Sequence, residues 1–174
     1  MPAIGEILNM KYNKTSKTQT LTGSNTTVAT PLFHITGTVR ISQLYSVVTT
    51  ALGTNVTAAH WRLNDQTVAT QVISLATGTT LSSAPVGSLL SRHSLVSVAL
   101  IYTSSAAGTV KDPVAATAPD VLMPLVIVQK KTAGAGIQSD VEFVYTTTEQ
   151  PTSGVIQHFV EWQPLSADGS VDVA

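Results

Sequence analysis

Residues 32–42 read LFHITGTVRIS, and apolar and polar side chains alternate along this segment. Its apolar face consists of Phe33, Ile35, Gly37, Val39 and Ile41. In an extended chain successive side chains point to opposite sides, so these five residues lie together. The alternation predicts a β-strand with one face in a hydrophobic core and the other, which carries His34 and Arg40, in solvent.

Short β-rich segments continue along the chain. They are residues 56–63, 67–76, 81–90, 95–103, 121–128, 137–147 and 155–162. Asn64 and Asp65 favour a turn between the first two segments, which predicts a hairpin, and Pro85 places its segment at a sheet edge. No segment longer than about ten residues keeps the apolar stripe of an α-helix. We therefore expect an all-β protein, a single antiparallel β-sandwich of jelly-roll or Greek-key type with about eight strands.

The first 30 residues differ in composition from the rest. Residues 13–30 are mostly lysine, threonine, serine and asparagine, with few apolar side chains. We interpret residues 1–30 as an N-terminal arm or lead-in strand and residues 31–174 as the β-sandwich domain. Residues 104–120 have no periodicity, and a connection of this length is typical of a functional or mobile loop.

The composition argues against several classes of protein. Charged residues make up 11% of the chain and the formal net charge is −1, whereas an average protein has roughly 25% charged residues. Nine lysines and arginines spread over the sequence make a poor nucleic-acid footprint. There is no cysteine for a disulfide or a thiolate metal site. No apolar run matches a bilayer-spanning helix, and the first residues do not resemble a signal peptide, so we expect no membrane partner and cytoplasmic synthesis.

The sequence contains no familiar catalytic pattern. We find no G-x-S-x-G, H-E-x-x-H, P-loop or G-x-G-x-x-G motif. The glycine-rich residues 133–136 lack the lysine and the following helix that a phosphate site requires, so they predict a hairpin turn. We therefore predict a protein that is not an enzyme and that holds neither a cofactor nor a metal ion.

Three polar residues on predicted strands need an interpretation. His158 lies on the apolar face of residues 155–162, which indicates either a hydrogen-bonded core histidine or a histidine at a subunit interface. Asp140 and Glu142 share the face opposite Val141. For these two carboxylates we expect a solvated strand face rather than a calcium or acid–base site.

Aromatic residues make up only 5% of the chain, and the alternation assigns most of them to the core. Tyr12, Tyr45 and Trp61 remain available for a sugar-binding platform. Trp61, however, shares a face with Ala59 and Leu63, so we expect it in the core as well. A carbohydrate-binding module is therefore the weaker interpretation.

Residues 121–128, VLMPLVIV, have no polar face, although an antiparallel sandwich strand normally keeps one. Pro124 indicates that the run lies at a sheet edge or a bulge. Such a strand needs a second cover, either the loop that precedes it or another subunit. The residues that we expect to contact another subunit or a capsid are Tyr12, Leu122, Pro124, Val126, Val128 and His158.

Three segments carry a resemblance to a known group of proteins. They are PLFHITGTVRI at residues 31–41 with VVTT at residues 47–50, and GVIQHFVEWQPLS at residues 154–166, which is closed by Asp168 and Gly169. Together they resemble tailed-bacteriophage virion structural proteins, namely capsid decoration (cement) proteins and head-fibre subunits.

The resemblance implies a β-sandwich subunit, a homotrimer, that binds the major capsid protein on the virion surface. It would stabilise the shell by bridging neighbouring capsid proteins, and it would be made in the host cytoplasm. The alternative is a tail-tip, baseplate or receptor-binding module that recognises carbohydrate. The resemblance assigns no functional residue.

Overall fold

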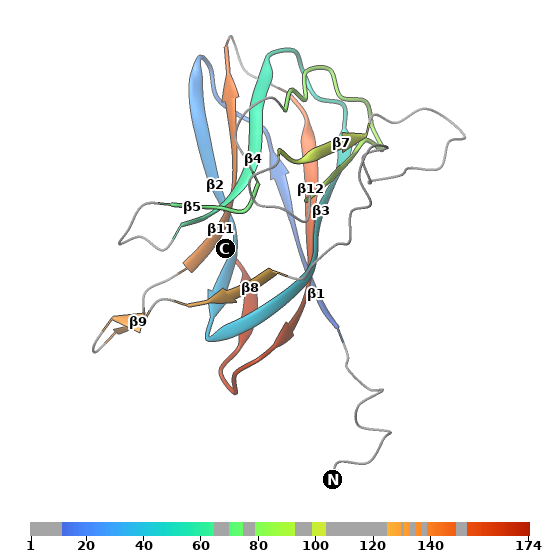
Figure 1. The fold of residues 1–174 in the computed structure, drawn as a ribbon. Helices are drawn as coiled ribbons and strands as arrows, with labels where there is room; N and C mark the ends of the chain where they lie inside the picture. The colour runs from blue at the N-terminus through green and yellow to red at the C-terminus, as the bar shows by residue number, and fades with distance from the viewer. Residues whose placement is uncertain are drawn as a thin grey trace.

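Two antiparallel β-sheets packed on each other make up the fold (Figure 1). The computed structural model describes residues 12–64, 70–74, 79–92, 99–103, 125–129, 131–132, 135–136, 139–148 and 153–174. Within these ranges all regular elements are strands, and all paired strands are antiparallel. The all-β sandwich predicted from the sequence is confirmed, while the jelly-roll or Greek-key assignment stays a prediction.

The first sheet, called sheet I, has the strand order β1-β12-β3-β6-β7, and β8 also pairs with β3. Its strands are β1 (Asn13–Thr20), β3 (Thr38–Thr50), β6 (Leu89–Ser91), β7 (Ile101–Thr103), β8 (Leu125–Val128) and β12 (Val155–Pro164). Sheet II has the order β13-β2-β11-β4-β5. Its strands are β2 (Thr26–Thr36), β4 (Val56–Asn64), β5 (Gln71–Val72), β11 (Ser139–Thr147) and β13 (Ser170–Val173).

The predicted hairpins are present, but one predicted edge strand is wrong. Strands β4 and β5 pair as expected, and β9 (Lys131–Thr132) pairs antiparallel with β10 (Ala135–Gly136). Residues 81–88, in contrast, form turns, in which Ala84 N–H donates to the carbonyl of Leu81 and Ser88 N–H to that of Pro85. Only Leu89–Ser91 is strand, and β6 lies between β3 and β7 rather than at an edge.

The segment 32–42 is not one strand, because Gly37 divides it and transfers the chain from sheet II to sheet I. Gly37 has φ 62°, a left-handed conformation that glycine adopts without steric cost. A β-carbon at this position would lie 2.5 Å from Oδ1 of Asp168 and from Oγ of Ser166. The predicted apolar face is nevertheless confirmed, since Phe33, Ile35 and their counterparts on β3 are all buried.

Strand β1 shows how polar residues can build a sheet edge. It pairs with β12 over its full length, and its inward polar groups bond to the opposite sheet. Oγ1 of Thr15 donates to the carbonyl of Val171 at 3.0 Å, and Nζ of Lys17 donates to the carbonyl of Ala174 at 2.6 Å. These bonds close one side of the sandwich. The boundary suggested at residue 30 falls inside β2.

Replacing Gly37 by alanine is expected to lower the free energy of unfolding by about 2 kcal/mol, because the left-handed backbone is strained for alanine and the new methyl group collides with two side chains. For a chain of this size the melting temperature would fall by about 4–8 °C. Thermal unfolding followed by circular dichroism measures the change. Thr36→Ala is the control at the neighbouring position, and an equal loss in both variants would contradict the explanation.

Candidate functional site

Of the six residues expected to form a contact surface, two lie outside the described residues, three are exposed at one end of sheet I, and His158 is buried. Leu122 and Pro124 lie outside the described residues. Val126, Val128 and Tyr12 are exposed on sheet I, at 53%, 64% and 50% of their full accessible area. In β8 the intervening Ile127 is buried, so this strand turns one apolar side chain into the core and leaves its two neighbours uncovered.

The exposed valines lie at one end of sheet I, where β8 pairs with the start of β3 (Figure 1). Strand register places Val126 opposite Arg40 and Val128 opposite Thr38. The backbone N–H of Leu165, a residue 54% exposed, donates to the carbonyl of Thr38.

Tyr12 immediately precedes β1, whose first residue, Asn13, pairs with Trp162 near the end of β12. Tyr12 therefore lies at the same end of sheet I as β8. We call Tyr12, Val126, Val128 and Leu165 the apolar patch. In the strand register Gln163 and Arg40 stand between the start of β1 and Val126, so the four side chains share one end of the sheet without forming a continuous apolar surface. Exposed apolar side chains of this size are found at protein contact sites.

His158 is not a surface contact residue, because the chain itself buries its side chain completely. Its Nδ1 lies 2.6 Å from Oγ of Ser46, and its Nε2 lies 2.9 Å from Oε1 of Gln19. The amide group of Gln19 in turn donates to Oγ1 of Thr30 at 2.8 Å. Ser46, His158 and Gln19 come from three neighbouring strands of sheet I, and Thr30 comes from sheet II, so the chain of bonds joins the two layers.

Burial lowers the pKa of His158 from 6.5 to about 3, and the positive charge of Lys17 acts in the same direction. The imidazole is therefore neutral at pH 7. With the amide of Gln19 oriented toward Thr30, Nε2 carries the proton and Nδ1 accepts from the hydroxyl of Ser46. Serine, histidine and an amide oxygen in sequence resemble a hydrolase triad, but Ser46 is as deeply buried as His158, and substrate cannot reach it. The core-histidine interpretation is the one that the structure supports.

The carboxylates of Asp140 and Glu142 are buried rather than solvated, which corrects the expectation from the sequence. Oδ1 of Asp140 lies 2.5 Å from Nδ1 of His34 on β2. Glu142 accepts from Nε of Arg62 at 2.7 Å and from the amide of Asn64 at 2.9 Å, both on β4.

Strand β11 is the central strand of sheet II, so each carboxylate has a neighbour that can supply a hydrogen-bond donor. Both acidic groups are thereby used in holding strands together, which is what a buried carboxylate requires.

An aromatic pair stands on the outer face of sheet I. Tyr45 on β3 and Phe159 on β12 are direct cross-strand neighbours, and their rings stack with centroids 5.0 Å apart at an angle of 19°. Both side chains are half-buried. Nζ of Lys14 lies over the pair, 4.6 Å from the Phe159 centroid and 5.5 Å from that of Tyr45. The hydroxyl of Tyr45 raises the pKa of Lys14. Trp61, by contrast, is fully buried in the core as predicted.

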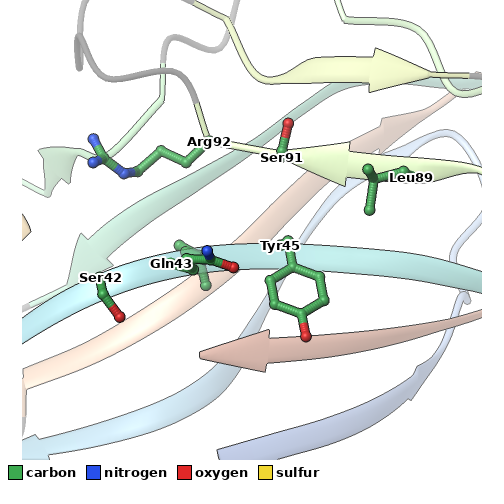
Figure 2. A pocket seen from close by; sticks show the side chains of 7 residues that line it. Ser42, Gln43, Tyr45, Leu89, Ser91 and Arg92 are labelled. Carbon is green, nitrogen blue, oxygen red and sulfur yellow. The ribbon is translucent and has the colours of Figure 1, made fainter. Parts of the chain in front are cut away.

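A hollow of about 260 Å³ opens beside Tyr45, between β3 and β6. Figure 2 shows Ser42, Gln43 and Tyr45 on one strand, with Leu89, Ser91 and Arg92 along its neighbour. Ser91 is the cross-strand partner of Tyr45 on the side away from Phe159. Oγ of Ser91 is buried and has no hydrogen-bond partner among the described residues.

The alternation changes phase at Ser42 and Gln43, so that Leu44 is buried and Tyr45 faces outward. Neither Phe159 nor Ser91 could be associated with Tyr45 from the sequence. These residues lie in strands far away along the chain, and only the register of β3 with β12 and β6 places them on its two sides.

The same described ranges show neither a metal-binding cluster nor a membrane-spanning helix. They contain no cluster of three or more histidine or acidic side chains that could hold a metal ion, and no helix with the length and apolar character needed to cross a bilayer. No known protein family, curated protein or solved structure matches the chain.

Proposed function

We propose that this chain is a non-enzymatic structural subunit of a tailed-phage virion, which decorates the capsid by bridging major capsid proteins. The observation that carries the proposal is the apolar patch. Its four large apolar side chains are each at least half exposed and lie at the same end of sheet I, on β8 or next to β1 and β12. Burying them against a protein partner in the virion, either its own copies in a homotrimer or the capsid protein, would remove this surface from water.

The remaining composition fits a protein that works through contacts rather than chemistry. Charged residues are only 11% of the chain, and the acidic groups of β11 are used in pairing strands. A decoration protein that binds only the assembled shell stabilises that shell by mass action. Many copies on one particle would compensate for modest affinity at each contact.

The first test is the mass of the purified chain by light scattering, followed by co-sedimentation with mature heads and immature proheads of the source phage. We expect three times the mass of the 18.2 kDa chain, and saturable binding to mature heads but not to proheads. A monomer without affinity for heads would contradict the proposal.

A charge-substituted patch provides the mutational test. Val126→Lys combined with Val128→Lys is expected to weaken trimer formation or head binding at least tenfold, because two ammonium groups would have to lose water in the contact. The matched control is Val72→Lys with Val173→Lys, at two exposed valines of sheet II. Both proteins should melt close to the parent temperature. An equal loss of binding in the control would show that the patch is not the contact.

A second candidate function, a tail-tip, baseplate or receptor-binding module, is favoured by a different observation. Tyr45 is half-buried, is stacked on Phe159 and borders the hollow. A supported aromatic ring at the edge of a hollow is suited to packing against the flat face of a sugar ring.

A further inference from the structure

The hollow beside Tyr45 combines a fixed aromatic wall with hydrogen-bonding groups. Strand pairing places Phe159 on one side of Tyr45 and Ser91 on the other. Phe159 stacks on the first side, so the tyrosine ring is supported and loses little freedom when a ligand packs against it. The side toward Ser91 borders the hollow.

The polar side chains of Ser91, Gln43 and Arg92 line the hollow. The hydroxyl of Ser91 is buried and unbonded within the described part of the chain, and a buried polar group without a partner is unfavourable. Ser91 is one of the residues that line the hollow. The amide of Gln43, on the opposite strand, is exposed at the rim. The guanidinium of Arg92 adds a planar set of donors.

We propose that this hollow binds one pyranose ring of a glycan. The C–H face of the sugar would pack on Tyr45, and its hydroxyl groups would bond to Ser91, Gln43 and Arg92. The volume of about 260 Å³ lies just below the range of pockets for drug-sized ligands, roughly 300–1,000 Å³, and so suits a single ring. The site goes beyond capsid decoration and operates whether or not the chain decorates a shell.

The cation of Lys14 lies over the same aromatic pair. A sugar that carries a carboxylate would gain from this charge, whereas a neutral sugar would not. Comparison of a methyl glucuronide with the matching methyl glucoside therefore distinguishes an acidic from a neutral ligand at one and the same site.

Saturation-transfer NMR on the purified chain tests the site. The probes are the methyl glycosides of glucose, galactose, mannose, N-acetylglucosamine and glucuronic acid. We expect at least one probe to bind with a dissociation constant on the order of 1 mM. If none of the five shows saturation transfer, the proposal is overturned. Because the assay needs neither heads nor oligomers, its failure is distinguishable from failure of the decoration proposal.

Variants separate the roles of the ring and the hydroxyl. Tyr45→Ala should weaken binding at least tenfold, whereas Tyr45→Phe, which keeps the ring, should bind nearly as well as the parent. Val72→Ala, at an exposed side chain of sheet II, is the control and should not change binding.

Ser91→Ala should weaken sugar binding severalfold without lowering the melting temperature, since the hydroxyl has no partner to lose among the described residues. A Ser91→Ala protein that melts lower and binds the probe as the parent does would assign the hydroxyl a structural role instead. If the Tyr45→Ala protein bound the probe as tightly as the parent, Tyr45 would not contact the sugar and the proposed site would be wrong.

Discussion

Replacing Phe143 by alanine is expected to lower the free energy of unfolding by about 3–5 kcal/mol. The side chain is completely buried and lies at the centre of a ring cluster. Its centroid is 6.0 Å from those of Trp61 and Tyr145, and 4.9 Å from that of His158. The substitution removes these contacts and leaves a cavity that the surrounding β-strands cannot easily fill. Urea unfolding at pH 7 measures the loss.

Phe159→Ala is the matched control for this prediction. Phe159 is also aromatic, but it is only half-buried on the outer face of sheet I, where solvent can occupy the vacated space. We expect a loss of about 1 kcal/mol, in the range for a surface aromatic pair. Equal losses in the two variants would contradict the placement of the core between the sheets.

Lowering the pH from 6.5 to 4.5 is expected to reduce the free energy of unfolding by about 2–3 kcal/mol through His158 alone. The pKa of this residue is 6.5 in an unfolded chain and about 3 in the fold, because burial opposes the charged form. Between these values the unfolded state binds a proton and the folded state does not. Stability therefore rises with pH across this window, by up to about 1.4 kcal/mol per pH unit.

Comparison of variants isolates this effect from other titrating groups. His158→Gln removes the buried imidazole, so its stability should fall less steeply between pH 6.5 and 4.5, even though it is less stable at pH 7. Ser46→Ala removes one hydrogen bond but keeps the imidazole, so its slope should remain steep. Urea unfolding at five pH values provides the curves. Parallel curves for the His158→Gln protein and the parent would rule out His158 as the cause.

The strand pattern was largely readable because alternation is a local property. Phe33 and Ile35 could be assigned to the core from their own neighbours in the chain, and their burial confirms the assignment. Strand β1 was not readable in this way. Its inward residues, such as Thr15 and Lys17, are polar, and they donate to the carbonyls of Val171 and Ala174 at the other end of the chain.

The carboxylates of β11 show that alternation cannot identify hydrogen-bond partners on other strands. Alternation places Asp140 and Glu142 on the side opposite Val141 and predicts that this side is solvated, whereas both side chains are buried. Their partners are His34 and Arg62, which lie 106 and 80 positions away in the sequence. Which donor stands beside a buried carboxylate depends on strand order, and strand order is not encoded in the alternation of any one segment.

Periodicity, turn residues and composition were sufficient for the all-β class and for the division of most strands into an apolar and a polar face, since each depends on residues within about ten positions. Strand pairing alone determined that His158 lies inside a hydrogen-bonded network, that the members of the apolar patch, on β8 and next to β1 and β12, lie at one end of sheet I, and that Tyr45 stands between Phe159 and Ser91. The reason is that sheets join segments far apart in the chain, and the energies that select one pairing belong to the contacts between strands.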